Sequence, residues 1–467
     1  MPRLVPCRPG RLLLALVLGS GCAAPPPPSP SPEASSPGLP AAPGVARNVL
    51  VVLADTLRAS NLGVYGHSRD TSPQLAALAA EGYLFEQARA QAPCTYPSAN
   101  SLLTGRDGTQ FWAQEGVRIG IPEGIPSLAE MLAGQGWTTI AVSASPIVRR
   151  SPSGNNRHGG FGRGFDLFDE RCLWQDARCV NQRALDYLES VREPFLLYLH
   201  YMDPHDPYLP PVRRFSSPSY PGKEFIARGE ANPIVEWLFG DGDPGFDVTE
   251  ADLEHLQASY DDEIAFFDVA LGELVEALRS RGVLEETLVA VIADHGEEFL
   301  EHRLIKHCNA LFDTEIHTPM VLRIPGLPGG RRLSPIVQNL DLVPTVLDYL
   351  GLEPTVELDG RSLRPLIEEG EPIHDQVFAA YGSLRAVVDE RFKLIADFAT
   401  GENRLYDRSA DPGETRDVAA EHPEVVVELQ QALTRWLRDT ERLEDQGEAL
   451  RRGQEAAERL RALGYIQ

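Results

Sequence analysis

Aspartate and histidine side chains follow three apolar runs of this sequence. They are Asp55 after the first run, Asp203 and His205 after the second, and Asp294 and His295 after the third. The loop beyond the third run adds four basic side chains, His302, Lys306, His307 and His317. One such residue is usually a helix cap or a satisfied histidine, but carboxylates and imidazoles that converge from separate elements are what a divalent cation needs. Their coincidence therefore predicts a metal site.

Three candidate nucleophiles lie close together in the stretch QAPCTYPSANSLLTGR, residues 91–106. They are Cys94, Thr95 and Ser98. Each residue type can attack an electrophile once a base, a lowered pKa or a metal activates it. Cys94 has two other interpretations, a buried apolar thiol or a disulfide with Cys308. Ser98 is expected to cap a helix that starts near Ala99.

The elements that would position these side chains alternate along the chain. Short β-branched apolar runs predict buried strands in residues 47–56, 138–145, 193–203 and 286–297. Segments with helical periodicity predict helices in residues 72–88, 126–136, 180–192 and 252–282. This alternation predicts an α/β fold with a mostly parallel sheet between helices and ligands at the carboxyl ends of its strands.

Four segments are expected along the chain. Residues 1–21 form a lipoprotein signal peptide and residues 22–46 a proline-rich linker. Residues 47–372 form the catalytic α/β domain. Residues 373–467 form a smaller α+β subdomain that ends in a charged helix, which the alternating charges predict to be solvated.

The N-terminal 22 residues resemble an export signal. Arginines precede the apolar run LLLALVL, and small residues precede Cys22, which would become a lipidated N-terminus. Ordinary signal cleavage and an uncleaved anchor remain as alternatives. The folded part is therefore expected outside the cytoplasm, lipid-anchored to a bacterial membrane on its periplasmic or cell-surface side.

Composition and charge narrow the class of protein. Hydrophobic residues make up 43% and charged residues 24% of the 467 residues, which is typical of a globular protein. The formal charge of -25 repels phosphate backbones, so no nucleic acid partner is expected. Cys172 and Cys179 are close enough in sequence to close a disulfide in an oxidising compartment.

Taken in order, the motifs resemble those of the sulfatases, in the alkaline phosphatase superfamily. The likeness runs through NVLVVLADTLRASNLGVYG, TYPSANSLLTGR, HYMDPHDPY, ADHGE, HTPMVLRIPG and NLDLVPTVLDYLG to RLYDRSADPGETRD. The resemblance implies an alkaline-phosphatase-like fold. It also implies a hydrolase of sulfate or phosphate esters, with small-molecule, glycan or lipid-linked substrates.

The resemblance assigns roles to individual residues. Asp55, Asp294 and His295 become metal ligands, and His205 contacts the oxyanion of the substrate. His307 and His317 lie where such enzymes keep basic groups around the ester and its leaving group. One divalent ion is expected, Ca, Mg, Mn or Zn, because Asp203, His205 and His317 lack the spacing of a second site.

The nucleophile segment departs from the sulfatase pattern. Sulfatases convert a Cys or Ser in Cys/Ser-x-Pro-x-Arg to formylglycine, but here Thr95 falls at the nucleophile position and Ala99 at the arginine position. No formylglycine is therefore expected. A threonine here resembles the metal-bound nucleophile of phosphodiesterases and phosphoethanolamine or phosphoglycerol transferases, which would make Thr95 a fourth metal ligand. Cys94 remains the nucleophile if the loop shifts by one residue.

The leading hypothesis is an ester hydrolase with a covalent intermediate on Thr95, in which His205 and Lys306 or His307 neutralise charge or protonate the leaving alcohol. One rival is an envelope transferase that passes the group to a lipid or glycan hydroxyl. Another is an inactive binding lipoprotein, which the cost of clustered, unpaired carboxylates disfavours.

Overall fold

The structure is a computed structural model of the chain. It describes residues 46–108, 120–121, 124–152, 156, 159–174, 176–220 and 249–440. The predicted signal peptide, the linker up to residue 45 and the end of the charged C-terminal segment lie outside these residues. None of the helices within the described ranges is long and apolar enough to cross a membrane.

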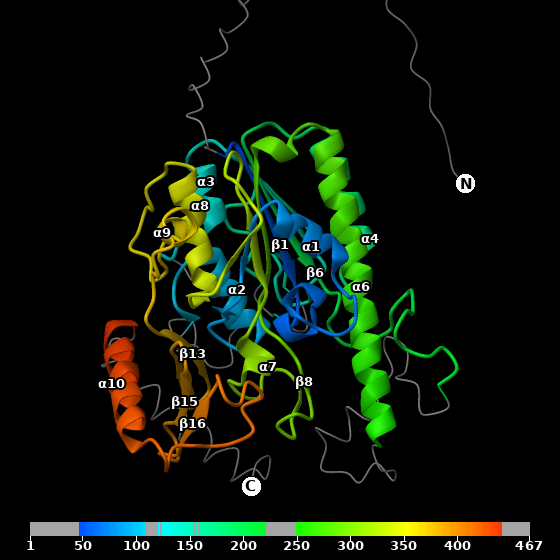
Figure 1. The fold of residues 1–467 in the computed structure, drawn as a ribbon. Coiled ribbons are helices and arrows are strands. Elements are labelled where there is room, and N and C mark those ends of the chain that lie inside the picture. The colour runs from blue at the N-terminus through cyan, green and yellow to red at the C-terminus, as the bar shows by residue number, and fades with distance from the viewer. Residues whose placement is uncertain are drawn as a thin grey trace, which may run out of the picture. The chain divides into compact units, whose positions relative to one another are not determined.

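An eight-stranded sheet forms the centre of the fold, in the order β11-β2-β10-β7-β1-β6-β4-β5 (Figure 1). Its strands are β1 (Asn48–Ala54), β2 (Tyr83–Phe85), β4 (Thr138–Ser143), β5 (Leu167–Asp169), β6 (Phe195–Tyr201), β7 (Thr287–Ala293), β10 (Met320–Arg323) and β11 (Arg331–Leu333). The five strands from β7 to β5 are mutually parallel, whereas β10 is antiparallel to β7 and β2. The predicted mostly parallel sheet is confirmed.

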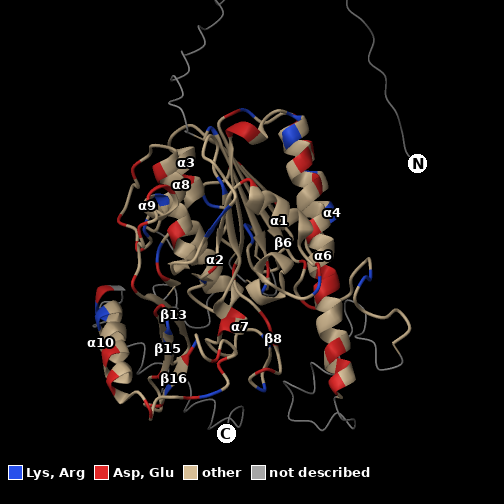
Figure 2. Ribbon diagram, in the orientation of Figure 1, with Lys and Arg blue, Asp and Glu red and all other residues tan. Residues whose placement is uncertain are grey.

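The four long central strands contain no Lys, Arg, Asp or Glu, and Figure 2 shows this sheet as a mainly uncharged layer. Side chains of β1 alternate between two cores. Leu50 and Val52 pack with residues of α1 (Pro73–Ala80), α4 (Ala177–Leu188) and α6 (Glu250–Ser280). Val49 and Val51 pack with α2 (Thr95–Thr104), α3 (Leu128–Ala133), α8 (Leu342–Tyr349) and α9 (Arg364–Glu368). Helices therefore bury both faces of the sheet, as parallel sheets require.

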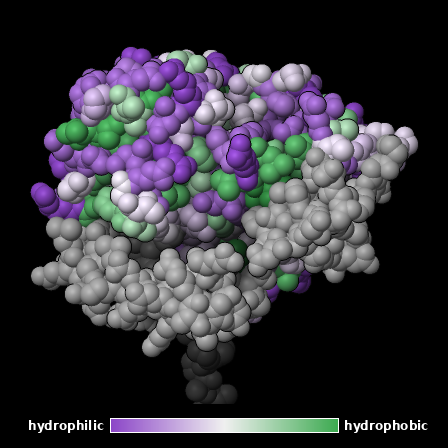
Figure 3. All heavy atoms as spheres, turned by 90° about the horizontal axis from the view of Figure 1, so that it is seen from below, coloured by the Kyte–Doolittle hydropathy of each residue, from purple (hydrophilic) through white to green (hydrophobic). Residues whose placement is uncertain are grey.

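A four-stranded antiparallel sheet forms the C-terminal subdomain. Its strands are β13 (Val377–Tyr381), β14 (Leu384–Val388), β15 (Phe392–Asp397) and β16 (Asn403–Asp407), and α10 (Pro423–Thr440) packs on it. The opposite side of the sheet packs against residues 310–316, which include α7 (Asp313–Ile316). In the face shown in Figure 3, hydrophilic residues predominate among the described atoms. The C-terminal sheet is thus anchored to a segment that lies close in sequence to His307 and His317.

Short elements complete the described part of the chain. They are the strand pairs β3 (Ala88–Arg89) with β12 (Val337–Gln338) and β8 (Glu298–Phe299) with β9 (Ile305–Lys306), and the 3-10 helices η1 (Ala59–Asn61), η2 (Gly63–Tyr65), η4 (Leu284–Glu286) and η5 (Asn339–Asp341).

Two local predictions are wrong. The helix expected over residues 72–88 ends at Ala80, because Tyr83–Phe85 pairs with β10 and β11 as strand β2. Ser98 does not cap a helix near Ala99, since α2 begins at Thr95 with Cys94 as its N-cap residue. The Ser98 hydroxyl instead donates a hydrogen bond to the carbonyl of Ala92 at 2.7 Å.

Candidate active site and metal centre

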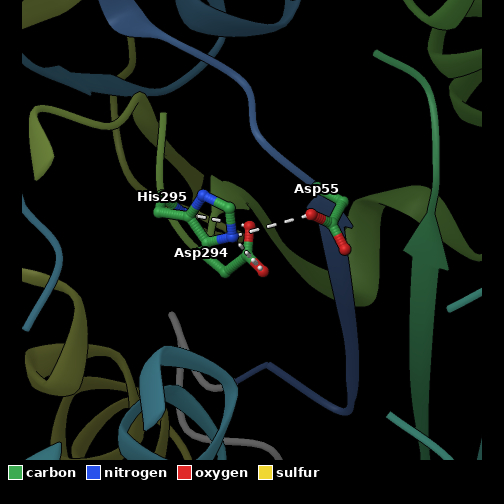
Figure 4. A group of neighbouring side chains, drawn as sticks. All are labelled: Asp55, Asp294 and His295. Atoms are coloured by element: carbon green, nitrogen blue, oxygen red, sulfur yellow. Dashed lines mark hydrogen bonds and ion pairs between the residues drawn. The ribbon is translucent and has the colours of Figure 1, made fainter. Parts of the chain in front are cut away.

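Asp55, Asp294 and His295 form a buried group at the carboxyl ends of β1 and β7. Each offers a ligand atom, and these atoms lie within 4.8 Å of one another (Figure 4). The register explains the meeting, because Ala54 at the end of β1 pairs with Ala293 at the end of β7. The next residues of the two parallel strands therefore leave the same edge of the sheet together.

Asp55 is held by a histidine from the neighbouring strand β6. One carboxylate oxygen of Asp55 lies 3.0 Å from Nε2 of His200, and Nδ1 of His200 lies 3.0 Å from the Tyr198 hydroxyl. A neutral His200 satisfies both contacts by donating from Nε2 and accepting at Nδ1. Burial raises the pKa of Asp55, but the hydrogen bond from His200 and the charge of His205 outweigh it, so the pKa lies well below its usual value. Asp55 is therefore an anion.

Asp294 is oriented by backbone amides. Its Oδ1 accepts hydrogen bonds from the N–H groups of Thr56 at 3.3 Å and His295 at 3.0 Å. Burial, followed by the nearby charge of Asp55, raises the pKa of Asp294. Two carboxylates this close repel each other unless a cation lies between them.

The tautomer of His295 is fixed by its own chain. Nδ1 lies 2.9 Å from the carbonyl oxygen of Gly296, which can only accept, so Nδ1 carries the proton. The lone pair of Nε2 then points to Thr95 Oγ1 at 3.2 Å, with carboxylate oxygens of Asp55 and Asp294 at 3.7 and 3.6 Å. Burial lowers the pKa of His295, which keeps the ring neutral as a metal ligand must be.

Unsatisfied oxygen atoms at this edge fit a cation. Asp55 Oδ1, Asp294 Oδ2 and Thr56 Oγ1 are buried and have no hydrogen-bond partner. Buried polar atoms normally have partners, and a charged one without a partner is costly. Two carboxylates, one imidazole and neighbouring hydroxyls form a donor set suited to a hard or borderline divalent ion. Among the described residues, Asp203, His205 and His317 do not form a second group of this kind.

The structure distinguishes the candidate nucleophiles by their environments. Thr95, buried to 3% exposure, is the first residue of α2 and faces His295. Cys94 forms a disulfide with Cys308, so its sulfur carries no free thiol. Cys172 and Cys179 form a second disulfide.

Basic side chains lie beside the metal-type group. The His307 ring is 4.5 Å from the His295 ring and 5.1 Å from the His205 ring, measured between centroids. His307 Nδ1 lies 3.0 Å from a carboxylate oxygen of Glu297. Burial lowers the pKa of His307, but the charge and hydrogen bond of Glu297 raise it more, to about 9. The His307 ring is therefore protonated at neutral pH.

Lys306 and His205 are linked through one carboxylate. Lys306 Nζ donates to Asp206 Oδ2 at 2.9 Å, and His205 Nδ1 lies 2.7 Å from the Asp206 carbonyl oxygen and 3.2 Å from its Oδ1. The charges of His205 and Lys306 outweigh burial and lower the pKa of Asp206. The predicted basic residues His205, Lys306 and His307 thus occupy one neighbourhood.

His317 contacts a different set of residues. Its Nε2 lies 2.9 Å from the Glu86 carbonyl oxygen, its ring meets Tyr65 edge-on, and its backbone bridges to Arg89. Burial, followed by the charge of Arg89, lowers its pKa to about 3. None of its described contacts reaches Asp55, Thr95 or His295.

Sequence reasoning missed His200 and Trp174. A histidine inside the otherwise apolar strand FLLYLHY, two residues after a tyrosine on the same face, signals a buried hydrogen-bonded imidazole. Trp174 lies in the loop closed by Cys172 and Cys179. The backbone N–H of Trp174 donates to the Ala144 carbonyl at 3.0 Å, and its ring is 5.6 Å from the His205 ring, measured between centroids. Neighbouring aromatic rings therefore form an unbroken row that leads to Thr95, in the order Trp174, His205, His307 and His295.

Known proteins share both the sequence pattern and the fold of this chain. A family model described as Sulfatase matches residues 47–352, and one described as N-sulphoglucosamine sulphohydrolase, C-terminal, matches residues 301–442. This chain belongs to the sulfatase family. The family comprises sulfuric ester hydrolases within the alkaline phosphatase superfamily, so the resemblance found in the sequence is confirmed at that level.

Individual sulfatases match part of the chain. Choline-sulfatase of Rhizobium meliloti (strain 1021) is 30% identical over 268 residues, which cover 54% of this chain and 51% of that protein. Arylsulfatase K of Danio rerio is 31% identical over 279 residues, which cover 52% of each chain. This sulfatase therefore spans about half the length of the curated relatives that it matches.

Solved structures share the fold over most of the chain. A 2-O GAG sulfatase has a TM-score of 0.68 at 20% identity, covering 85% of this chain and 92% of that one. The phosphonate monoester hydrolase of Agrobacterium radiobacter has a TM-score of 0.66 at 23% identity, covering 86% and 96%. At these identities the likeness establishes the sulfatase fold.

Proposed function

We propose that this sulfatase hydrolyses sulfate esters through a covalent intermediate on Thr95. The observation that carries the proposal is the 3.2 Å contact between the Thr95 hydroxyl and His295, beside two carboxylates with unsatisfied oxygens. The disulfide at Cys94 supports the choice of nucleophile, because it leaves no thiol for attack or for conversion to formylglycine.

Asp55, Asp294 and His295, with Thr95, would hold one divalent ion. A bound ion supplies positive charge that lowers the pKa of a nearby hydroxyl and stabilises charge that develops on the ester oxygens. The chain's own part begins with orientation. His200 holds the Asp55 carboxylate and Gly296 holds the His295 ring, so the ligands are aligned before substrate arrives.

The Thr95 hydroxyl passes its proton to solvent, and its oxygen attacks the ester sulfur in line while the bond from sulfur to the alcohol oxygen breaks. His307 is suited to protonate the departing alcohol oxygen, because Glu297 engages its Nδ1 and leaves its Nε2 for the leaving group. His205 and Lys306 lie beside His307 and would neutralise the other ester oxygens. Water then attacks the sulfur of the Thr95 ester, releases sulfate and restores the threonine hydroxyl.

The charge balance beside the nucleophile favours an ester with one negative charge. Lys306 already contacts Asp206, and His307 already contacts Glu297. Lys306 and His307 therefore each face a carboxylate already, which leaves little of their charge for the dianion of a phosphate monoester. A sulfate monoester carries a single negative charge, and its alcohol is proposed to be a small molecule or a glycan residue.

Export and lipid anchoring of the chain are part of the same proposal. Two disulfides in the described residues support an oxidising compartment. The signal peptide and Cys22 lie outside the described residues, so the attachment of a lipid to Cys22 is tested by labelling. Labelling with a radioactive fatty acid should mark the wild type and not Cys22→Ser.

The test of catalysis uses the full chain in detergent with Mg, Mn, Ca or Zn supplied after chelation. Hydrolysis is compared on p-nitrophenyl sulfate, p-nitrophenyl phosphate and bis(p-nitrophenyl) phosphate. We expect metal-dependent turnover that is fastest on the sulfate ester. Acid quenching during turnover should leave a sulfo group on the peptide that contains Thr95, detected by mass spectrometry.

Other outcomes separate the alternatives. Faster turnover of a phosphate ester would assign the site to phosphoryl transfer, and turnover only in the presence of a lipid or glycan acceptor would assign a transferase. Metal binding without turnover of any ester would indicate an inactive binding protein.

A further inference from the structure

The Cys94–Cys308 disulfide joins the start of α2, which carries the proposed nucleophile, to the loop that carries the proposed proton donor. Cys94 directly precedes Thr95, and Cys308 directly follows His307. The two cysteines are 214 residues apart in sequence. The bond is therefore a covalent link between segments that the chain itself does not hold together.

A backbone hydrogen bond reinforces this link. The N–H of Cys308 donates to the carbonyl oxygen of Pro93 at 2.9 Å, so residues 93–94 contact Cys308 twice. On the other side of Cys308, the N–H groups of Asn309 and Ala310 donate to the Glu315 carboxylate at 3.2 and 3.1 Å. Cys308 and the two residues that follow it are thus attached to neighbouring elements.

The backbone around His307 needs such attachment. Lys306 and Cys308, on either side of His307, have φ angles of 63° and 64°. Residues with a Cβ rarely adopt this left-handed region, and they remain there only when the surroundings hold them. Without the link, the loop is expected to relax toward negative φ and to carry the His307 ring away from Thr95.

We propose that the Cys94–Cys308 disulfide is a positioning device that keeps His307 aligned with Thr95, so that turnover depends on its oxidised state. The proposal rests on the proposed function, because it takes Thr95 and His307 as the reacting pair. Both cysteines are half-buried, which lets a small reductant reach them. A thiol reductant would deliver two electrons and two protons to the sulfur pair and convert it to two thiols.

The second disulfide provides a matched control. Cys172–Cys179 closes a local loop with a sequence separation of 7, and Cys172 is fully buried. This bond joins neither Thr95 nor His307. Its loss removes one covalent link from the same domain without releasing the proposed reacting pair.

The experiment compares the full-length wild type with the double variants Cys94→Ser/Cys308→Ser and Cys172→Ser/Cys179→Ser. Circular dichroism sets a temperature at which all three are folded. On p-nitrophenyl sulfate we expect the first variant to lose at least about tenfold in kcat with KM within about threefold, because misaligned groups slow the reaction more than binding. The control variant should keep its kcat. Metal affinity, measured by calorimetry, should change little, because Asp55, Asp294 and His295 lie on segments that this disulfide does not join.

Two further measurements do not depend on the choice of substrate. Hydrogen exchange followed by mass spectrometry should be faster over residues 92–98 and 303–309 in the first variant only. A thiol reductant should produce the same exchange pattern in the wild type and no further change in the first variant. Unchanged exchange in these segments, or an unchanged kcat, would overturn the positioning role. If the wild type hydrolyses no ester, the proposed function fails, while the exchange data still decide whether the disulfide fixes the loop.

Discussion

The Thr95 hydroxyl oxygen lies 3.2 Å from Nε2 of His295, the nitrogen that also faces Asp55 and Asp294. Because the Gly296 carbonyl holds the proton of His295 on Nδ1, the lone pair of Nε2 is available to a hydroxyl proton or to a metal ion. The first turn of α2 thus places a hydroxyl group against a metal-type cluster built from two parallel strands.

Replacing this hydroxyl should abolish turnover without unfolding the protein. Thr95→Ala is expected to lower kcat by at least about a thousandfold, as removal of a nucleophile does in other hydrolases with a covalent intermediate. Thr95→Ser keeps the oxygen and should retain measurable turnover with a sulfo group on Ser. Steady-state kinetics on p-nitrophenyl sulfate measures both. A Thr95→Ala enzyme as fast as the wild type would exclude the threonine mechanism.

His200 should control the metal site without touching the metal. His200→Phe removes the hydrogen bond to Asp55, and loss of such an outer partner typically lowers metal affinity about 10- to 100-fold. Calorimetric titration with Mn or Ca measures the dissociation constant directly. Tyr198→Phe serves as the control, because it leaves the bond from His200 to Asp55 in place and should cost less affinity. Equal affinities in the wild type and His200→Phe would contradict this role.

Much of the fold could be predicted because its long strands are uninterrupted apolar runs. The strands that end at Ala54 and Ala293 can be recognised from their apolar, β-branched composition, and the carboxylates that follow them mark one edge of the sheet. Tyr83–Phe85 could not be recognised as a strand, because it continues a helical pattern and its partners lie more than 200 residues away. Short strands of this kind are defined by pairing and not by local periodicity.

The same distinction applies to the site. His200 contacts Asp55 only because β6 pairs with β1 in a register that sets Leu53 against His200. The pairing of Cys94 with Cys308 likewise needs the folded chain, and the sequence left it as one of several alternatives. His317 shares a loop with His307 in sequence, but its bridge to Arg89 directs it to other partners.

Trp174 should contribute to substrate affinity. Its ring lies beside His205 at the outer end of the row that leads to Thr95, where the alcohol part of an ester would emerge. Trp174→Ala is expected to raise KM up to about tenfold for a glycan sulfate with little change in kcat, because aromatic contacts contribute about 0.5–1.5 kcal/mol beyond buried area. Phe398→Ala, an exposed aromatic of the C-terminal subdomain, is the control. An unchanged KM for Trp174→Ala would place the alcohol elsewhere.

His317 should make stability depend on pH. Burial and the charge of Arg89 lower its pKa to about 3, whereas an unfolded histidine has a pKa of about 6.5. Between these values the unfolded chain binds a proton that the folded chain does not. The free energy of unfolding therefore falls as the pH drops below about 6.5, by up to about 1.4 kcal/mol per pH unit from this residue. Urea unfolding from pH 7 to pH 4 should show a shallower fall in His317→Gln, and parallel curves would contradict the assignment.

Lys393 should anchor the C-terminal sheet to the catalytic domain. This lysine of β15 is fully buried, and its Nζ contacts Asp313 of α7 at 2.9 Å and Glu414 at 3.2 Å. Lys393→Met leaves Glu414 without its cation in a buried place, which typically costs about 3–5 kcal/mol of unfolding free energy, whereas Asp313 keeps its contact with Arg89 at 2.7 Å. Arg391→Ala is the matched control, because this arginine pairs with Asp407 while its side chain is 56% exposed.

The control should lose much less stability than Lys393→Met, since solvent screens an exposed pair. Urea unfolding at pH 7 measures both variants. The location of Asp313 in α7 adds a second expected effect. Two carbonyl oxygens of α7, those of Glu315 and Thr314, accept hydrogen bonds from the backbone N–H groups of Gly296 and Glu297. Loosening α7 should therefore reach the loop after His295 and weaken metal binding in Lys393→Met but not in Arg391→Ala. Equal losses of stability in the two variants would show that the buried lysine is not the anchor.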